Sequence, residues 1–242
     1  MELPIYYDEE EEWKSALLLY DSALKEVNTK LEILNNEFKM AHRYNPIEHI
    51  TSRIKSAESI AKKMRHKNRE LTVENIVKYI NDVAGIRIIC SFWSDIYRIA
   101  DAIAKQNDVK VLKVKDYIVN PKGNGYKSYH MIVSVPIFLS ENVIETKVEI
   151  QIRTIAMDFW ASLEHKIYYK FEGNAPENIS KDLKECADII SYLDHKMQSL
   201  NEEVQGYNRD TVREYKELMA QNYLNSLKAS YGTIIDEEEV EE

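Results

Sequence analysis

Two long stretches of the chain carry apolar residues at alternating steps of four and three. The first stretch comprises Trp13, Leu17, Tyr20, Leu24, Val27, Leu31, Leu34, Phe38 and Ala41. The second comprises Ile179, Leu183, Cys186, Ile190, Leu193, Met197, Leu200 and Val204. This spacing predicts two long helices, each with a heptad seam along one face. The pattern leaves open whether the seams pack within one chain or against a second subunit.

The middle of the chain changes period several times, which indicates both helices and strands. We predict shorter helices over Ile47 to Lys67, Thr72 to Asn81, Ser94 to Lys105 and Ile155 to Lys170. We predict strands over Ile86 to Cys90, Val109 to Ile118, Ser128 to Val135 (ended by Pro136) and Val143 to Arg153. The predicted fold class is α/β of the α+β kind, with a mixed sheet of about five strands covered by helices.

The strand that ends at Arg153 shows the clearest alternation. From Val148 onward, apolar residues alternate with Glu149, Gln151 and Arg153, which predicts a half-buried strand with one polar face. Thr154 then suits the N-cap of the helix that follows. An acid, an amide and a base on one rigid strand face form a candidate site. The alternative is the solvated outer face of an edge strand.

Charge is distributed unevenly along the 242 residues. The net charge of −9 comes from two acidic runs, over Asp8 to Glu12 and over Asp236 to Glu242. Without the eleven acids of these runs, 30 acidic residues face 32 Lys and Arg, so the middle of the chain is close to neutral. We expect residues 1–12 and 236–242 to be solvated tails, residues 13–205 to be one domain and residues 206–235 to be a helical extension.

The cysteines and the apolar runs bear on the cellular compartment. Cys90 and Cys186 are far apart in the sequence and lie in apolar surroundings, which predicts reduced thiols rather than a disulfide framework. The N-terminus is acidic and carries no signal of the secretory kind, and no apolar run approaches the length of a membrane span. We therefore expect a cytoplasmic protein with no membrane partner.

A basic segment follows Pro46. Between Arg53 and Arg69, seven residues are Lys or Arg and only Glu58 is acidic. So many cations favour an anionic ligand, and phosphate oxygens accept the charge-assisted hydrogen bonds that Arg and Lys donate. Arg53 and Lys55 are the stronger candidates, because they lie near the turn after Pro46, whereas an exposed helix face is the favoured explanation for Lys62, Lys67 and Arg69. Nucleic acid is a further candidate ligand, although the segment lacks the interleaved aromatic residues of a stacking groove.

Two carboxylates and one loop complete the candidate chemistry. Asp82 precedes the first predicted strand and Glu149 lies on the last, and together they would suit Mg²⁺, which takes one or two carboxylates plus substrate phosphates. The loop from Lys122 to His130 offers glycines for close backbone approach, cations for phosphate and Tyr126 for stacking on a base. It does not match the P-loop pattern, and a plain hairpin loop is the alternative.

Several short motifs occur together in one order along the chain. They are Asn45–His49, Ser52–Ser56, Asp82–Ile88, Lys115–Ile118, Gly125–His130, Val148–Thr154 and Ala156–Ala161. In this combination the chain resembles the synthetase domain of the RelA/SpoT homologue family, and in particular the small alarmone synthetases of the RelP type. The resemblance covers roughly Asp8 to Val204 and implies a nucleotidyltransferase-like fold. It also implies transfer of the β,γ-pyrophosphate of ATP to the ribose 3′-hydroxyl of GDP or GTP, with AMP and ppGpp or pppGpp as products.

The resemblance implies a role for each matching residue. The phosphates of ATP would be held by Arg53, Lys55, Lys63 and Arg65, and Arg87 would stack on adenine. Asp82 and Glu149 would bind the cofactor Mg²⁺ and, with Arg53, form the catalytic centre. Tyr126 would stack on guanine beside Ala156 and Asp158, and the acceptor phosphates would meet Lys115, Lys122 and His130. Asp158 stands where relatives often carry Asn.

The resemblance also implies partners and limits. Small members of the family form homotetramers through their terminal helices, and single-stranded RNA is a further candidate ligand. The chain contains no His-Asp dipeptide, which the hydrolase site of the long family members requires, so we expect synthesis without hydrolysis. Two other functions remain as alternatives: a related enzyme with a different acceptor, and a catalytically silent RNA-binding protein. The presence of Asp82 and Glu149 argues against the second alternative.

Overall fold

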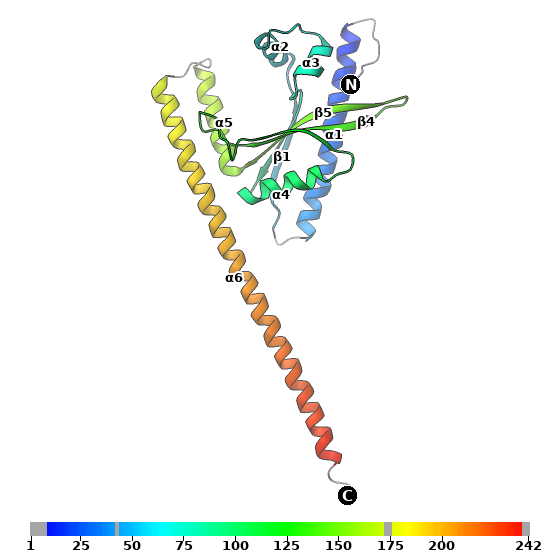
Figure 1. The fold of residues 1–242 in the computed structure, drawn as a ribbon, viewed down its shortest axis with the longest axis vertical. Helices are drawn as coiled ribbons and strands as arrows, with labels where there is room; N and C mark the ends of the chain where they lie inside the picture. Colours follow the sequence, from blue (N-terminus) through cyan, green and yellow to red (C-terminus); the bar gives the residue numbers. More distant parts are fainter. Residues whose placement is uncertain (1–8, 42–43, 172–175, 239–242) are drawn as a thin grey trace. The chain divides into compact units, whose positions relative to one another are not determined.

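A computed structural model of the chain describes residues 9–41, 44–171 and 176–238. Two compact units follow one another along the chain, Met1–His195 and Lys196–Glu242. The described elements (Figure 1) are α1 (Glu9–Ala41), β1 (Ile47–Ile54), α2 (Ala57–His66), α3 (Val73–Tyr79), β2 (Ala84–Cys90), α4 (Trp93–Ala104), β3 (Lys110–Asp116), β4 (Tyr129–Phe138), β5 (Val143–Thr154), α5 (Ile155–Lys170) and α6 (Glu177–Glu238). The predicted bounds of the tails, the main domain and the extension stay predictions.

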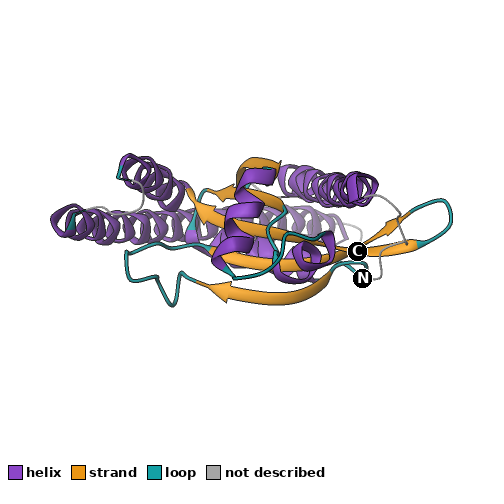
Figure 2. Cartoon of the chain, turned by 90° about the horizontal axis from the view of Figure 1, so that it is seen from above, coloured by secondary structure: helices purple, strands orange, loops and turns teal. Residues whose placement is uncertain are grey.

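The first unit contains one mixed sheet of five strands in the order β1-β2-β5-β4-β3. β2 and β5 run parallel, whereas the other neighbouring pairs are antiparallel. β5 is the central strand, because β2 pairs with one of its edges and β4 with the other. Figure 2 shows the strands in orange with helices packed along the sheet. This architecture confirms the predicted fold class.

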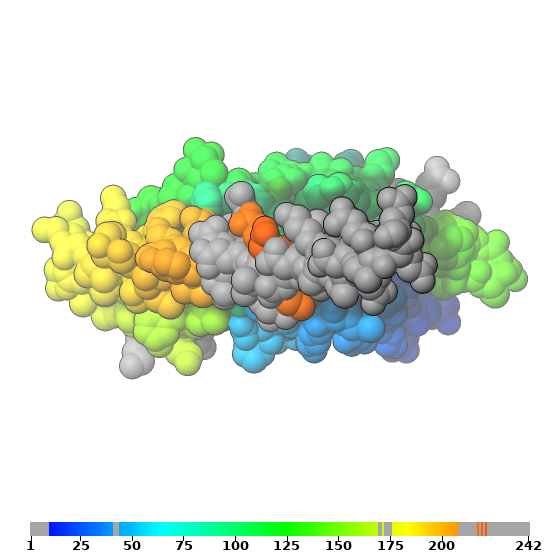
Figure 3. Space-filling model, turned by 90° about the horizontal axis from the view of Figure 1, so that it is seen from below, coloured from blue at the N-terminus to red at the C-terminus, as the bar shows by residue number. Residues whose placement is uncertain are grey.

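α6 carries the second heptad seam. Its first turns belong to the first unit, where Leu183 and Ala187 are buried. In the second unit, Met197, Leu200 and Val204 are exposed, with 43–56% of their surface accessible. Figure 3 shows the described part of this helix in yellow and orange at the surface. Among the described helices, none combines the length and the apolar character that crossing a bilayer requires.

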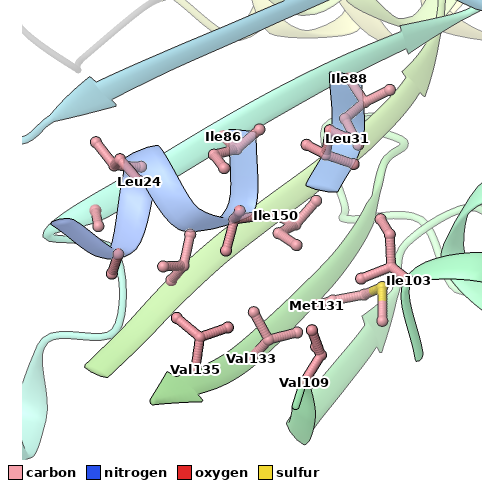
Figure 4. Packing of buried hydrophobic residues seen from close by; sticks show 14 of the residues in the cluster. Leu24, Leu31, Ile86, Ile88, Ile103, Val109, Met131, Val133, Val135 and Ile150 are labelled. Carbon is pink, nitrogen blue, oxygen red and sulfur yellow. The ribbon is translucent and has the colours of Figure 1, made fainter. Parts of the chain in front are cut away.

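The first heptad seam packs on the sheet of its own chain. Leu24 and Leu31 of α1 lie against Ile86, Ile88 and Ile150 of the two central parallel strands (Figure 4). Isoleucines of α4 and the inward side chains of β4 join the same buried cluster. For this seam the structure therefore gives the packing within one chain that the pattern had left open.

One predicted helix is wrong over half its length. Ile47–Ile54 is strand β1, which pairs antiparallel with β2, and the helix begins only at Ala57. β1 is an edge strand whose side chains are mostly exposed, so it shows none of the apolar alternation that identifies a half-buried strand. Ser56 marks the change, since its hydroxyl accepts a hydrogen bond from the Ser59 amide and caps α2.

The other helices and strands are confirmed within a few residues, except that the second long helix and the predicted helical extension form the single helix α6 and that one strand boundary is corrected. β4 does not end at Pro136 but continues to Phe138, with Pro136 opposite Glu145 of β5. β3 pairs with β4 only as far as Ser134. Pro136 therefore lies where β4 has no β3 neighbour and has become an edge, which is where strands tolerate proline. The predicted break at Gly173–Pro176 falls largely outside the described residues. Cys90 and Cys186 are both free, as predicted.

Candidate functional site

The sheet face opposite α1 carries polar side chains on β1, β2 and β5. Strand pairing places Arg53 beside Gly85, and Gly85 beside Glu149. Because Gly85 has no side chain, the space between Arg53 and Glu149 stays open. A cavity lies there, lined by Thr51, Ser52, Arg53, Asp82, Gly85, Ile86, Arg87, Glu149 and Gln151. The structure thus brings four predicted site residues together: Arg53, Asp82, Arg87 and Glu149.

Asp82 stands at the entrance to β2 between two lysines. Lys55 Nζ lies 2.8 Å from one carboxylate oxygen and Lys63 Nζ lies 2.7 Å from the other. Burial alone would raise the pKa of Asp82, but the hydrogen bonds and charges of the two lysines outweigh it and hold the pKa below its ordinary value. Asp82 is therefore a carboxylate at neutral pH, and two predicted ATP-binding lysines are fixed at the cavity.

Glu149 occupies the middle of the polar face of β5. Gln151 Nε2 donates to Glu149 Oε2 over 2.8 Å, and His130 Nδ1 lies 3.5 Å from Glu149 Oε1. Burial would raise the pKa of Glu149, as would the nearby charge of Asp82, but the His130 and Gln151 contacts lower it further than burial raises it. Glu149 is thus ionised at neutral pH, and its orientation is set by two neighbours.

The two carboxylates fit a divalent cation that also needs substrate oxygens. Asp82 and Glu149 line one cavity, the charge of Asp82 acts on the pKa of Glu149, and both side chains are ionised. Among the described residues, no three or more His, Cys, Asp or Glu side chains gather into a complete metal site. Mg²⁺ is commonly held by one or two carboxylates together with phosphate oxygens, and the donor set here matches that preference.

Arg153 is buried, with 5% of its surface exposed, and its guanidinium donates to four side chains. Nε donates to Ser128 Oγ over 3.3 Å, and Nη1 donates to Asp158 Oδ1 over 3.0 Å. Nη2 donates to the Tyr126 hydroxyl over 2.6 Å and to Gln151 Oε1 over 3.1 Å. Arg153 therefore connects the strand face to the loop before β4 and to the first turn of α5.

Asp158 lies between two guanidinium groups. Its Oδ1 atom is 3.0 Å from Arg153 and 3.3 Å from Arg87. Burial lowers the pKa of Arg87, and the positive charges of Arg153 and Arg53 lower it further, while Asp158 opposes them. A carboxylate is well suited to this position, because it compensates two cations that would otherwise repel each other.

The position of Asp158 follows from the junction of β5 and α5. Thr154 Oγ1 accepts a hydrogen bond from the Met157 amide over 3.1 Å, which confirms the predicted N-cap. The Thr154 hydroxyl also donates to Asp194 of α6 over 2.7 Å. The Thr154 hydroxyl thus connects the first turn of α5 to α6. Asp158 projects from that turn toward Arg153.

The loop before β4 brings two predicted acceptor-binding residues, Lys122 and Tyr126, next to a third, His130 of β4. The Tyr126 hydroxyl lies 2.9 Å from His130 Nε2. Lys122 Nζ lies 4.5 Å from the centroid of the Tyr126 ring and 4.9 Å from that of Tyr117, within the range of cation–π attraction. Tyr117 packs edge-on against Tyr126 and His130. A cluster of aromatic and cationic groups therefore stands beside the carboxylate cavity.

This loop is docked on the first turns of α6. Gly125 has a φ of +89°, and a Cβ atom there would lie 2.5 Å from the Cβ of Ala187. The next contact along is a hydrogen bond from Lys127 to Ser191. Tyr126 packs against a small cluster of Trp160, Ala161 and Ala187. The docking leaves room for a backbone at Gly125 but none for a side chain.

Three predicted residues lie at the margin of these clusters. Arg65 is exposed in the last turn of α2, Lys115 is exposed on β3 opposite His130, and Ala156 is half-buried in the first turn of α5. Sequence reasoning included Gln151 and Arg153 in the candidate site on the polar face of β5, but it gave neither of them a specific role. Tyr117 was missed as well, and only its neighbours in space reveal it.

Comparison with known proteins identifies the family of the chain. The family described as the region found in RelA and SpoT proteins matches residues 52–174. The chain is similar to the GTP pyrophosphokinase YwaC of Bacillus subtilis, with 50% identity over 194 residues, 80% of this chain and 92% of that protein. Among solved structures it is similar to the small alarmone synthetase 2 of Bacillus subtilis, with a TM-score of 0.73, 48% identity and coverage of 79% of this chain and 99% of the other.

A second solved relative carries nucleotides. The small alarmone synthetase 1 of Bacillus subtilis, bound to its product pppGpp, has a TM-score of 0.75 and 36% identity over 80% of this chain and 98% of its own. The same synthetase bound to AMPCPP has a TM-score of 0.68 and 33% identity over 81% of this chain and 98% of its own.

We predict that Asp82→Asn destabilises the fold by about 1–3 kcal/mol at pH 7, because Lys55 and Lys63 lose their charged partner. The pKa of Asp82 is lowered in the folded state, so its stabilisation is fully present above the ordinary value of 3.8 and is lost as the pH falls through the folded-state pKa. The free energy of unfolding in urea should therefore differ more between the wild-type protein and Asp82→Asn at pH 7 than at pH 3.

The matched control is Asp101→Asn. Asp101 pairs with Lys105 on the exposed surface of α4, and we expect a change below about 0.5 kcal/mol. An equal effect of Asp82→Asn at both pH values would contradict the ion-pair account.

We predict that Gly125→Ala destabilises the protein by about 1–3 kcal/mol, because the added methyl group meets Ala187 and the backbone conformation disfavours a side chain. Gly123→Ala is the matched control in the same loop, since nothing lies within 4 Å of a Cβ atom there. Thermal unfolding should separate the two variants. Equal Tm values would show that the loop is not docked on α6 as described.

Proposed function

Since the chain belongs to the family that carries the RelA/SpoT region, we propose that it is a GTP pyrophosphokinase that makes (p)ppGpp. It transfers the β,γ-pyrophosphate of ATP to the 3′-hydroxyl of GDP or GTP and releases AMP. The single observation that carries this proposal is the sheet face itself. There, the carboxylates Asp82 and Glu149 lie between cationic side chains on one flank and the cluster around Tyr126 on the other.

The donor nucleotide binds on the β1–β2 side. Arg53 lines the cavity. Lys55 and Lys63 donate hydrogen bonds to Asp82, which also lines it. These cations match the charge of a triphosphate. Arg87 lines the same cavity with about a third of its side chain exposed, and its planar guanidinium suits stacking on adenine. Arg65, exposed on α2, is the outermost member of this set.

The acceptor nucleotide binds on the β4–α5 side. Tyr126 supplies an aromatic ring for guanine, and Asp158 supplies a carboxylate that can accept from the N1–H and N2–H groups of guanine, beside Ala156. His130, Lys115 and Lys122 supply charge or hydrogen bonds for the acceptor phosphates. Lys115 and His130 are paired across β3 and β4, which brings them to one place.

Positioning and charge stabilisation account for most of the chemistry in such transfers. Mg²⁺, held by Asp82 and Glu149, would neutralise phosphate charge. Arg53, Lys55 and Lys63 stabilise the negative charge that moves toward AMP as the bond between the α- and β-phosphates breaks. Glu149 is ionised and oriented by Gln151 and His130, so it can accept the proton of the 3′-hydroxyl as that oxygen attacks the β-phosphorus.

The finer parts of the proposal concern assembly and limits. We propose a homotetramer built through the terminal helices, and the exposed Met197, Leu200 and Val204 on α6 support a further apolar contact there. We propose synthesis without hydrolysis, on the ground that the sequence contains no His-Asp dipeptide. The RelP type, a cytoplasmic location and the binding of single-stranded RNA stay predictions.

We predict that Glu149→Gln lowers the rate of AMP formation about 100-fold or more and leaves the Tm nearly unchanged, since the amide keeps the size of the side chain but not its basicity or its charge. The purified protein is mixed with Mg²⁺, ATP and either GDP or GTP, and the nucleotides are separated by anion exchange.

Glu145→Gln serves as the control. Glu145 lies on the same strand as Glu149, four residues earlier, and accepts a hydrogen bond from Ser134 outside the cavity, so this variant should keep wild-type turnover. Near-normal turnover of the Glu149 variant would refute the site assignment. A well-folded wild-type protein that leaves ATP untouched with both acceptors would refute the proposed function.

A further inference from the structure

Arg153 joins Tyr126, in the loop before β4, to the polar side chains of β5, alongside His130, which contacts both Tyr126 and Glu149. On one side its Nη2 atom donates to the hydroxyl of Tyr126, and its guanidinium carbon lies 5.1 Å from the centroid of the Tyr126 ring. On the other side Nη2 donates to Gln151, whose amide in turn donates to Glu149 over 2.8 Å. A continuous chain of hydrogen bonds thus runs from the aromatic ring to the carboxylate.

We propose that Arg153 is a positioning residue, which holds Tyr126 and, through Gln151, Glu149 in a fixed relation to each other. The inference rests on the proposed function, since Tyr126 is there the platform for the guanine base and Glu149 the acceptor of the 3′-proton. The base and the 3′-hydroxyl belong to one nucleotide. A fixed distance between the Tyr126 ring and the Glu149 carboxylate therefore brings the 3′-hydroxyl to Glu149 whenever the guanine base is stacked on Tyr126.

The geometry calls for an arginine. Nε, Nη1 and Nη2 point in three directions and reach Ser128, Asp158 and the Tyr126–Gln151 pair at the same time. A lysine ammonium is a single point on a flexible stem and cannot reproduce this planar fork. The four bonds leave the buried guanidinium little freedom to rotate, and this rigidity is transmitted to the side chains that it contacts.

Asp158 makes the buried charge possible. An unpaired guanidinium at 5% exposure would be costly, and the Asp158 carboxylate 3.0 Å from Nη1 compensates it. The carboxylate also lies 3.3 Å from Arg87 of the donor side, so it compensates both guanidinium groups. Arg153→Lys keeps the positive charge next to Asp158 and removes the fork, which separates positioning from charge balance.

The test is a kinetic comparison of the wild-type protein with Arg153→Lys. We expect the KM for GDP to rise about tenfold and kcat to fall about tenfold, with the KM for ATP within about twofold and the Tm within a few degrees. Arg98→Lys is the matched control, because Arg98 lies over the Phe38 ring at 5.0 Å, away from the cavity, and this variant should behave as wild type.

A double-mutant cycle with Tyr126→Phe identifies the route of the effect. Tyr126→Phe removes the hydroxyl that contacts both Arg153 and His130 and leaves the ring. If Arg153 acts through Tyr126, the double variant loses less than the product of the two separate losses. Strictly multiplicative losses would overturn the proposal, as would unchanged kinetics. A lowered Tm with equal loss of ATP and GDP binding would also overturn it, because that result describes a structural role.

A measurement without turnover keeps this claim separate from the proposed function. The ring signal of ¹³C-labelled Tyr126, identified by its absence in Tyr126→Phe, should shift in Arg153→Lys and stay in place in Arg98→Lys. An unshifted signal would overturn the positioning role even if the wild-type protein makes AMP. A wild-type protein that makes no AMP, combined with a shifted signal, would refute the proposed function alone.

Discussion

The two-sided character of β5 is the constraint on which the rest of the structure depends. Val148, Ile150 and Ile152 are fully buried beneath α1. A strand alternates its side chains between faces, so the same pairing that buries them forces Glu149 and its polar neighbours onto the opposite face. A shift of one residue in the pairing of β5 would bury the charges and expose the isoleucines. The core therefore enforces the geometry of the site as well as the stability of the fold.

Charge compensation organises that polar face. Asp82 forms ion pairs with Lys55 and Lys63. Asp158 forms ion pairs with Arg153 and Arg87, so each carboxylate holds two cations in place. Arg53 adds further positive charge beside them. The protein's own carboxylates hold these cations in place, and in the proposed function the phosphates of two nucleotides would supply further anions. Preorganised charge of this kind is what phosphoryl and pyrophosphoryl transfer require.

Much of this fold could be predicted from periodicity, because the seam of α1, the alternation of β5 and the Thr154 cap are local patterns with one structural meaning. Strand β1 could not be predicted from periodicity, because an exposed edge strand is specified by its partner β2 rather than by its own residues. Arg53, Asp82 and Glu149 of the cavity were found from charge and strand position, and Arg87 from the resemblance to a known family. The role of Arg153 and the docking of Gly125 on Ala187 depend on distances between segments far apart in sequence, which no local pattern encodes.

The most direct test of the account follows the β-phosphorus of ATP. The protein is incubated with Mg²⁺, GDP and ATP labelled at the β-phosphate, and the labelled nucleotides are separated. If the carboxylates and cations on this sheet face direct attack at the β-phosphorus, the label moves to the guanosine product, and unlabelled AMP forms in equal amount. Label that remains in ADP would show transfer of the γ-phosphate alone and would contradict the account.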